Sequence, residues 1–391
     1  MSSGGVKKLF YSGHGQEEQP AVILLARVRA VACSLPFFAI SMKARKLCWR
    51  VFGLEHFFFE NALTDASASG ARANEEQAKF TFAACSECSV SKLICFSEEA
   101  CMTSTPKALV IGGRSGLLGQ ALMDALGRSR WYAVPLGRQD GNLLDVNFLA
   151  RKIQRIAPDL IFNTLAWTQV DLAEEKPAEA MAVNRGFVSS LTHSIRGTSI
   201  RLVHYSTDFV FNGKKQTPYT TEDSPKPESV YGVTKLAGEQ ALASLPASQY
   251  CIVRTAWLFG PGRKNFVETI LQACCKRDSL EVVHDQIGSP TYTRDLALWS
   301  LKLAELEAGG VFHAVNAGQA SWCDLACEAI NLAEGVCRVS PISSAQWPQK
   351  AKRPPFSVLD TSRLTEVTGL VPRPWPLALR EYVYREYLPG H

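Results

Sequence analysis

A tyrosine and a lysine four positions apart, Tyr231 and Lys235, have the side chains that acid catalysis at a carbonyl group requires. Pro225 and Pro227 keep the preceding stretch non-helical and good helix formers follow, so a helix is predicted from Tyr231 to about Leu245. Side chains at this spacing lie on one face of a helix and can share a small site. The ammonium would favour the phenolate and lower the pKa of Tyr231, which suits a group that protonates a carbonyl oxygen while a hydride reaches the carbon. The alternative for the same spacing is a solvated helix face.

A glycine-rich turn predicts a dinucleotide site. The apolar stretch Ala108–Ile111 indicates a strand, and Leu118, Leu122 and Leu126 follow at the spacing of an amphipathic helix. A strand, a Gly-x-x-Gly-x-x-Gly turn and a helix place a pyrophosphate at the helix N-terminus, because the glycines let the backbone approach it. The alternative is an ordinary glycine-rich loop. The cofactor contacts expected in the turn are Gly113, Arg114, Ser115, Gly116, Leu117, Leu118 and Gly119.

A third stretch, from Arg201 to Asp208, indicates a buried strand that ends in small hydroxyl side chains. Its Thr207 precedes Tyr231 by 24 positions (231 − 207). The glycine turn, this strand end and the Tyr-x-x-x-Lys helix, in this order, resemble the short-chain dehydrogenase/reductase superfamily.

Strand and helix patterns alternate from residue 102 to residue 260, which predicts an α/β fold with a Rossmann-like, doubly wound parallel sheet that binds NAD(P). The predicted strands are Ala108–Ile111, Tyr132–Leu136, Leu160–Ala166, Arg201–Ser206 and Tyr250–Arg254, with helices such as Phe148–Ile156 and Ala178–Ile195 between them. Residues 261–391 alternate less regularly and are expected to form mainly a smaller substrate-binding domain, with later segments free to return to the sheet. Its predicted elements are the helices Phe266–Lys276, Arg294–Glu307, Leu325–Glu334 and Leu377–Tyr387 and the strand Val311–Val315.

The choice of cofactor depends on Arg138, which directly follows the second predicted strand. An acidic residue there would bind an NAD ribose, whereas a guanidinium suits the 2′-phosphate of NADPH. NADPH is therefore the expected cofactor, with NADH left open, and the alternative for Arg138 is a solvated loop arginine. Further cofactor contacts are expected at the adenine, from Asp145 and Val146, and on the ribose side, from Leu165, Ala166 and Trp167.

Composition favours an ordinary globular enzyme. Of 391 residues, 46% are hydrophobic and 20% charged, and the net charge of +5 is spread without a dense basic run, so we expect no nucleic-acid partner. The apolar stretch Pro20–Leu25 is interrupted by Arg27 and Arg29, too early for a membrane span. The twelve cysteines show no framework, which is typical of a cytoplasmic protein with reduced thiols.

Residues 1–101 differ from the rest, and we expect a poorly ordered extension or translated sequence upstream of the true start. Cys85-x-x-Cys88 with Cys95 and Cys101 resembles part of a zinc site, but no second close pair and no neighbouring histidine complete it, so no metal is expected. A targeting peptide would need an apolar region and a cleavage site that this segment lacks. From Met102 the chain begins as a mature reductase would.

From Lys107 to the C-terminus, the chain resembles the dTDP-4-dehydrorhamnose reductases, which are extended short-chain reductases. Beyond the glycine turn and Tyr-x-x-x-Lys, narrower motifs carry this resemblance in the family's order. They are Asn163-Thr-Leu-Ala-Trp-Thr-Gln-Val-Asp-Leu-Ala-Glu174, Ser206-Thr-Asp-Phe-Val-Phe211, Arg254-Thr-Ala-Trp-Leu-Phe-Gly260, Asn265-Phe266, Asp285-Gln-Ile-Gly-Ser-Pro-Thr291, Arg353-Pro354 and Leu359-Asp-Thr-Ser-Arg-Leu364.

The resemblance implies that NADPH reduces C4 of dTDP-4-dehydro-L-rhamnose to give dTDP-L-rhamnose. Tyr231 would donate the proton, Thr207 would hydrogen-bond the keto oxygen, and Lys235 would bind the nicotinamide ribose. The implied substrate contacts are Thr207, Asp208, Phe209, Trp257, Asn265, Gln286 and Arg353. For Trp257 the alternative is a tryptophan of the hydrophobic core.

The chain departs from the family where Trp167 and Phe209 stand in place of the usual tyrosines and His284 stands where an acid is common. The glutamates of the family's magnesium-linked dimers have no counterpart that we can place, so no metal is expected and a homodimer stays open. Two other functions stay open: a catalytically silent regulatory subunit, like the β subunit of methionine adenosyltransferase, and another sugar-nucleotide reductase or epimerase. The silent relatives tend to lose the hydroxyl that Thr207 keeps.

We predict that Arg138→Asp shifts cofactor preference from NADPH toward NADH, because it removes a phosphate partner and adds repulsion. A charge-assisted contact of this kind contributes about 1.5–3 kcal/mol, or roughly tenfold to a hundredfold in affinity. Comparing KM for the two cofactors in wild type and variant checks this. An equal effect on both cofactors would mean that Arg138 does not touch the phosphate.

Overall fold

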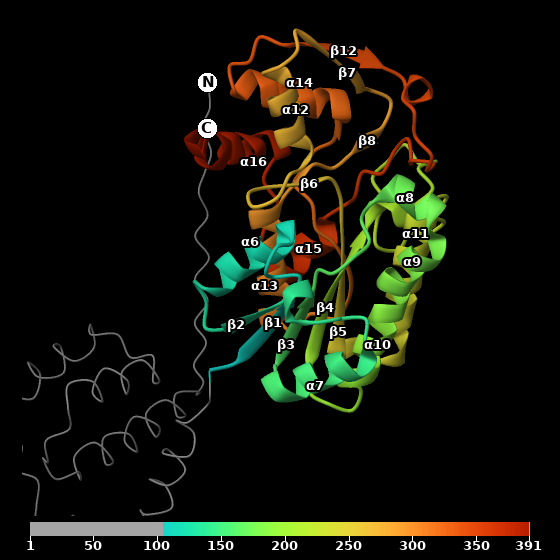
Figure 1. The fold of residues 1–391 in the computed structure, drawn as a ribbon, viewed down its shortest axis with the longest axis vertical. Helices are drawn as coiled ribbons and strands as arrows, with labels where there is room; N and C mark the ends of the chain where they lie inside the picture. Colours follow the sequence, from blue (N-terminus) through green and yellow to red (C-terminus); the bar gives the residue numbers. More distant parts are fainter. Residues whose placement is uncertain (1–104, 391) are drawn as a thin grey trace, which may run out of the picture. The chain divides into compact units, whose positions relative to one another are not determined.

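The computed structural model describes residues 105–390 (Figure 1). The extension predicted for residues 1–101, with its cysteine cluster, lies outside this range. Within it, no helix is both long enough and apolar enough to cross a membrane.

The centre of the fold is a parallel sheet of six strands in the order β10-β5-β4-β3-β1-β2 (Figure 1). The inner strands β1, β3, β4 and β5 are short, mostly apolar runs buried on both faces, which is typical of parallel sheets. The strand order reverses between β1 and β3, and the crevice at such a switch point is where α/β sheets bind ligands. The strand bounds are β1 Lys107–Ile111, β2 Tyr132–Leu136, β3 Leu160–Asn163, β4 Arg201–Thr207, β5 Tyr250–Thr255 and β10 Gly310–His313.

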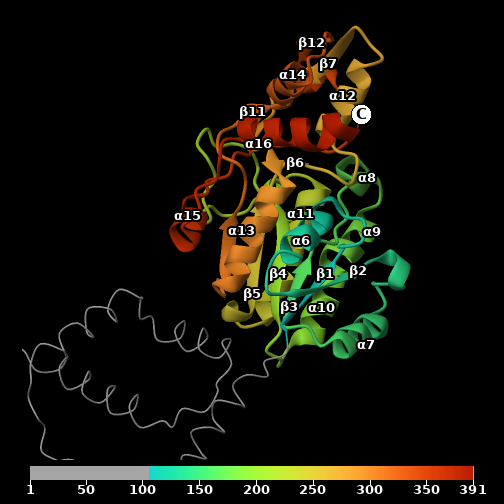
Figure 2. The same cartoon turned by 90° about the vertical axis from the view of Figure 1, so that its left-hand side faces the viewer.

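Helices cover both faces of this sheet (Figures 1 and 2). Side chains of β1 alternate between two cores: Ala108 and Val110 pack against α6 and α13, while Leu109 and Ile111 pack against α7 and α10. The Rossmann-like, doubly wound fold predicted from the sequence is therefore confirmed. The helix bounds are α6 Leu117–Leu126, α7 Val146–Ile156, α8 Val170–Glu175, α9 Pro177–Met181, α10 Phe187–Ile195, α11 Val230–Ala241, α13 Thr293–Glu305 and α15 Ser362–Thr368.

A smaller group of elements, drawn at the top of Figure 1, packs around a third core. In it, β7 pairs in parallel with β12, and α12, α14 and α16 surround the apolar side chains. Its bounds are α12 Phe266–Cys274, β7 Ser279–Val283, α14 Trp322–Leu332, β12 Arg338–Ile342 and α16 Trp375–Tyr382, with two-residue strands β6 Leu258–Phe259, β8 Ile287–Gly288, β9 Thr291–Tyr292 and β11 Ala320–Ser321. The smaller C-terminal part of the predicted fold is thus present.

Three sequence predictions need correction. The third strand ends at Asn163 instead of Ala166, because the Asn163 side chain bonds the buried His204 ring (3.0 Å) and the chain then leaves the sheet. The strand predicted at Val311–Val315 spans Gly310–His313 instead; it is β10, and it joins the large sheet beside β5, which the sequence analysis had left open. The single helix predicted over Ala178–Ile195 contains a π turn between α9 and α10.

The turn after β1 brings its backbone close to the helix that follows. Gly112, one position before the predicted motif, has φ +92°, a conformation that favours glycine. A Cβ on Gly119 would lie 2.3 Å from the carbonyl oxygen of Gly112 and 2.9 Å from the Cα of Gly113. Glycine at position 119 therefore lets α6 pack directly on the turn and holds the turn's shape.

We predict that Gly119→Ala destabilises the protein and weakens nucleotide binding, because the added methyl group would overlap rigid backbone. Such overpacking costs about 1–3 kcal/mol. The matched control is Gly186→Ala, whose Cβ would lie 3.9 Å from its nearest neighbour in helical backbone. Urea unfolding and NADPH titration check both variants, and equal stability of the two would contradict this account of the turn.

Candidate active site

Three predicted catalytic residues meet at the carboxyl end of the sheet. Thr207 is the last residue of β4, and Tyr231 and Lys235 lie on α11. Helix α11 begins at Ser229, whose hydroxyl accepts a hydrogen bond from the backbone N–H of Gly232 (3.2 Å). Tyr231 and Lys235 are both buried, so the alternative of a solvated helix face does not hold for this pair.

Lys235 is 3% exposed, and its Nζ donates a hydrogen bond to the carbonyl oxygen of Tyr205 (2.6 Å). Burial lowers the pKa of Lys235 to about 8, and the charge of Glu239, one helical turn further on, opposes that shift. Glu239 is itself held by Arg254 through two buried hydrogen bonds of 2.9 and 2.8 Å. The ammonium is therefore buried and held by the backbone of β4.

The pKa of Tyr231 moves in the direction opposite to the one predicted from sequence. Burial raises it to about 12; a hydrogen bond with Thr207 lowers it, and the charge of Asp208 raises it further. The Nζ of Lys235 donates its hydrogen bond to the carbonyl oxygen of Tyr205. Tyr231 is consequently a protonated phenol at neutral pH, which is the form that can give a proton away.

Asp208 and Phe209, expected to contact substrate, lie in a 3₁₀ turn directly after β4. Both carboxylate oxygens of Asp208 accept hydrogen bonds from protein hydroxyls, Oδ1 from Thr207 (2.9 Å) and Oδ2 from Ser357 (2.6 Å). The ring of Phe209 lies edge-on to that of Tyr231, with 5.5 Å between their centroids. Asp208 thus links the hydroxyl of Thr207 to that of Ser357, a residue that the sequence analysis missed.

Of the two arginines in and near the glycine turn, one forms an ion pair within the protein and the other does not. Arg114 forms two hydrogen bonds with Asp140 (2.6 and 2.7 Å), and the Arg114 guanidinium lowers the pKa of that carboxyl. Arg138 is exposed, and its guanidinium makes no hydrogen bond or ion pair with any residue in the described range 105–390. Arg138, the predicted partner of the 2′-phosphate, therefore has its N–H donors free to bind a ligand.

The predicted adenine and ribose contacts lie on loops that follow β2 and β3. Asp145 accepts hydrogen bonds from the backbone N–H groups of Asn147 and Phe148 (2.9 and 3.1 Å), so it caps α7, and Val146 is exposed beside it. Leu165, Ala166 and Trp167 form the irregular segment after β3.

A further residue that the sequence analysis missed, Asn184, fixes this segment. Its side chain accepts a hydrogen bond from the N–H of Trp167 (2.8 Å) and donates one to the hydroxyl of Thr234 on α11 (3.0 Å). Asn184 lies in the π turn between α9 and α10, and such turns are frequent at functional sites. The signal for it in the sequence was an asparagine on the buried side of a predicted helix.

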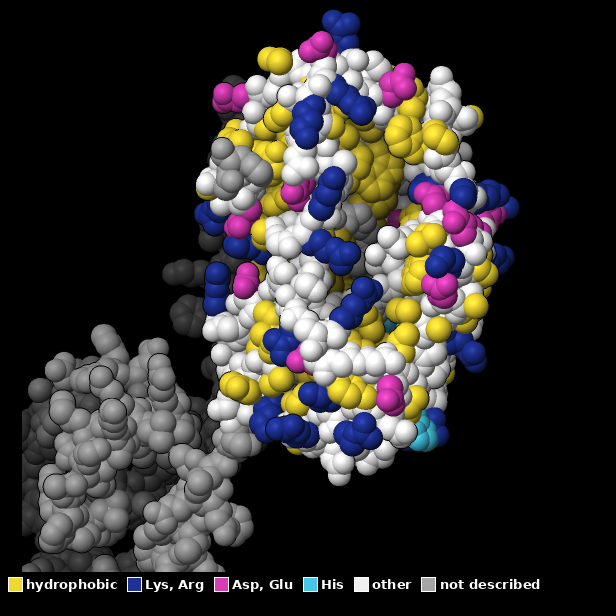
Figure 3. Space-filling model, in the orientation of Figure 1, with side chains coloured by type: hydrophobic (Ala, Val, Ile, Leu, Met, Phe, Trp, Pro, Cys, Tyr) yellow, Lys and Arg dark blue, Asp and Glu magenta, His cyan; other side chains and the backbone are white. Residues whose placement is uncertain are grey.

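Trp257 lies in an aromatic group at the edge of the small part. It stacks on Trp322 at 3.6 Å between centroids and 5° between planes, and Phe266 packs against Trp322 at 4.6 Å. Trp257 also has φ +48°, which is uncommon for a bulky residue. Figure 3 shows hydrophobic side chains lining a hollow in this upper part of the surface. Trp322 comes from a distant helix and was not predicted.

Three predicted substrate contacts, Asn265, Gln286 and Arg353, have partners within the protein, and their role toward a substrate stays a prediction. Asn265 caps α12 and donates to the Gly260 carbonyl (2.9 Å) and the Tyr382 hydroxyl (3.0 Å). The Gln286 amide donates to Ser344 (2.9 Å) and accepts from Trp322 (3.2 Å). Both Nη atoms of Arg353 bind Asp171, at 3.0 and 2.7 Å.

Asn265 and Gln286 are buried, and the hydrogen bond from Arg353 is the largest cause of the lowered pKa of Asp171, which falls to about 2. All three residues are thus held in place by the protein, and they remain predicted substrate contacts.

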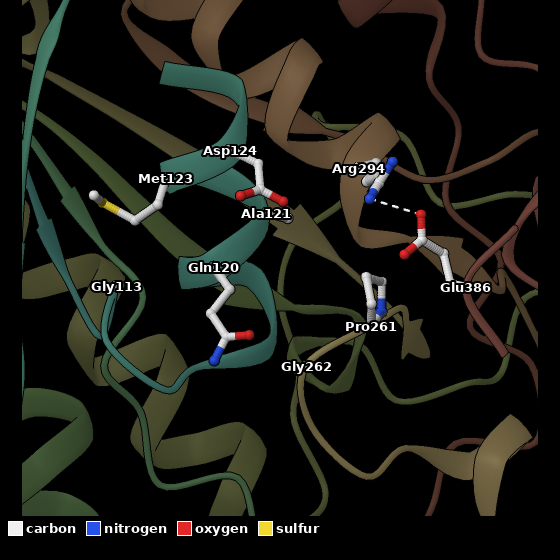
Figure 4. A pocket seen from close by; sticks show the side chains of 9 residues that line it. All are labelled: Gly113, Gln120, Ala121, Met123, Asp124, Pro261, Gly262, Arg294 and Glu386. Atoms are coloured by element: carbon white, nitrogen blue, oxygen red, sulfur yellow. Dashed lines mark ion pairs between the residues drawn. The ribbon is translucent and has the colours of Figure 1, made fainter. Parts of the chain in front are cut away.

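A cavity of about 270 Å³ adjoins the glycine turn (Figure 4). Gly113 and the outer side of α6 line it, together with an ion pair between Arg294 and Glu386 (2.6 Å). Of the predicted site residues, Gly113 alone borders it. Within residues 105–390, no group of three or more histidine, cysteine, aspartate or glutamate side chains could hold a metal ion.

Comparison with known proteins identifies the family. Residues 107–388 match the family model described as the RmlD substrate binding domain. The chain is 40% identical to a dTDP-4-dehydrorhamnose reductase of Streptomyces griseus, covering 71% of this chain and 92% of the relative. It is 37% identical to a dTDP-4-keto-6-deoxy-D-glucose reductase of Streptomyces niveus, over 70% of this chain and 95% of the relative. A crystal structure of a dTDP-4-dehydrorhamnose reductase from Bacillus anthracis in complex with NADP matches with a TM-score of 0.69 and 29% identity, covering 72% of this chain and 99% of that one.

We predict that Asn184→Ala loosens the segment after β3. The N–H of Trp167 would lose its acceptor, which costs about 1–3 kcal/mol of stability when the group stays buried, and KM for the nicotinamide cofactor should rise several-fold. Asn331→Ala is the control, because Asn331 is exposed on a helix and its side chain makes no hydrogen bond within the described residues. Unfolding curves and initial rates test this, and unchanged values for Asn184→Ala would contradict the role assigned to Asn184.

Proposed function

Because this chain belongs to the RmlD substrate binding domain family, we propose that it reduces the C4 keto group of a dTDP-linked deoxysugar with a nicotinamide cofactor. The observation that carries the proposal is the position of Tyr231, a buried phenol that shares a hydrogen bond with Thr207 and lies one helical turn before the buried Lys235. A silent regulatory subunit would have no use for a proton donor kept in this state.

For the substrate, we propose dTDP-4-dehydro-L-rhamnose, which would be converted to dTDP-L-rhamnose. The names of relatives at 34–40% identity support a dTDP-4-keto sugar, and the Streptomyces niveus relative is named for a different one. The stacked pair of Trp257 and Trp322 offers an aromatic surface for the base or the sugar. Initial rates with dTDP-4-dehydro-L-rhamnose and with dTDP-4-keto-6-deoxy-D-glucose would separate the two specificities.

NADPH is the proposed cofactor, and the residues around the glycine turn fit it. The space that a Cβ on Gly116 or Gly119 would fill is occupied by backbone of the turn, so the turn keeps the compact form that receives a pyrophosphate. Arg138 would bind the 2′-phosphate, Lys235 the nicotinamide ribose, and Asp145 to Val146 the adenine side. When bound, NADPH supplies the hydride that adds to C4.

The chain's own residues supply the proton and position the keto oxygen that receives it. As the C4 carbonyl gains a hydride, its oxygen becomes an alkoxide, which takes the phenolic proton of Tyr231. Thr207 holds that oxygen by a hydrogen bond, and the buried ammonium of Lys235 favours the negative charge left on the phenol. We further propose that residues 102–260 mainly hold the cofactor and residues 261–391 mainly the sugar nucleotide.

We predict that Tyr231→Phe lowers kcat roughly 100- to 10,000-fold, about 3–5 kcal/mol of barrier, because the alkoxide loses its proton donor. Cofactor affinity should change little, since the ring still packs against Phe209. Tyr384→Phe, at an exposed tyrosine, is the matched control and should keep wild-type turnover. Substrate-dependent NADPH oxidation measures both.

Undiminished turnover in Tyr231→Phe would contradict the assignment of the acid. A wild-type protein that binds NADPH but oxidises it with neither keto sugar would instead support the silent regulatory subunit.

A further inference from the structure

Asp208 is a buried carboxylate that binds the catalytic hydroxyl and has no direct contact with a cation. It is 2% exposed, and both of its oxygens are engaged by hydroxyl donors. Oδ1 accepts from Thr207 and Oδ2 from Ser357, which lies on the segment between β12 and α15. One hydrogen-bonded chain therefore joins the end of β4 to a segment 149 positions later in the sequence.

The Thr207 hydroxyl has one proton, and two acceptors compete for it. In the proposed reaction this hydroxyl donates to the keto oxygen of the substrate. In the structure, the Thr207 hydroxyl donates its proton to Asp208, at 2.9 Å. Toward Tyr231, the Thr207 oxygen can therefore only accept a hydrogen bond. Thr207 cannot serve Asp208 and the substrate as donor at the same time.

We propose that Asp208 is a positioning residue that sets the direction in which the Thr207 hydroxyl donates. When ionised, Asp208 draws the proton of Thr207 away from the keto oxygen. When protonated, Asp208 donates its own O–H to the Thr207 oxygen, and the Thr207 proton then turns to the substrate. This change moves no proton to the product, whose new O–H bond still comes from Tyr231. The inference rests on the proposed function, because it concerns the same keto oxygen.

The groups that face Asp208 allow it to titrate in a useful range. Thr207 on β4, Tyr231 on α11 and Ser357 on the C-terminal segment surround its carboxylate. Burial raises the pKa of Asp208 to about 6, and the hydrogen bonds from Ser357 and Thr207 restrain that rise. Lys235, the nearby cation on α11, has its pKa lowered by burial to about 8, so the two groups titrate in separate ranges.

The test is the dependence of kcat on pH, between about pH 5 and about pH 9, at saturating NADPH and keto sugar, after subtraction of the acid decay of NADPH. For the wild type we expect kcat to rise about fivefold to tenfold as the pH falls through about 6, since one hydrogen bond to the keto oxygen is gained. Asp208→Asn cannot ionise, and its profile should lack this rise. Ser357→Ala removes a donor that favours the carboxylate, so the rise should move to higher pH.

Asp278→Asn is the matched control, because Asp278 is exposed and far along the chain from the site, and it should keep the wild-type profile. A rise that persists unchanged in both Asp208→Asn and Ser357→Ala would overturn the inference while leaving the reductase function intact. If Asp208→Asn does not fold, Ser357→Ala alone decides, since a purely structural role would lower stability without moving the inflection. A wild type inactive with every dTDP-4-keto sugar would refute the proposed function itself.

Discussion

The close approach of α11 to the end of β4 is the constraint on which the rest of the site depends. A Cβ at position 232 would lie 2.2 Å from the carbonyl oxygen of Phe209, and one at position 238 would lie 2.3 Å from that of Asn184. Glycine at both positions lets one helix touch two backbone segments, one carrying Thr207 and the other holding the loop after β3. Tyr231 consequently lies beside Thr207 because of packing that its own side chain does not provide.

The ionisable side chains on and beside α11 are buried, and their charges are arranged accordingly. Lys235, Glu239 and Arg254 are each less than 9% exposed, and two cations share one carboxylate. Burying charges in this way is costly unless they are paired and hydrogen-bonded, and the two bonds between Glu239 and Arg254 meet that need. In the proposed reaction, the positive charge of Lys235 would favour the negative charge that develops on the phenol and on the keto oxygen. The arrangement that is costly in the resting protein would then favour the transition state.

Much of this architecture could be predicted from the sequence, and the failures have a common physical cause. Strands such as Tyr132–Leu136 were found with their bounds, because a short apolar run between polar turns is a local signal. Asn184, Trp322 and Ser357 were missed because each meets the site only through the tertiary fold. The pKa of Tyr231 was predicted in the wrong direction because burial, which dominates it, has no counterpart in the spacing of two residues.

The C-terminal segment shows why the cofactor and substrate halves of this fold cannot be separated cleanly at residue 260. Ser357 donates its backbone N–H to Ile287 (2.8 Å), next to Gly288, whose Cβ would meet the Trp257 ring. Its hydroxyl reaches the opposite way, to Asp208 behind the catalytic threonine. One residue therefore contacts both the strand that backs the aromatic surface and the carboxylate that holds Thr207. Backbone hydrogen bonds hold this segment against Ile287 on one side and Tyr219 on the other. The position of the Ser357 hydroxyl at Asp208 therefore depends on elements from both parts of the fold.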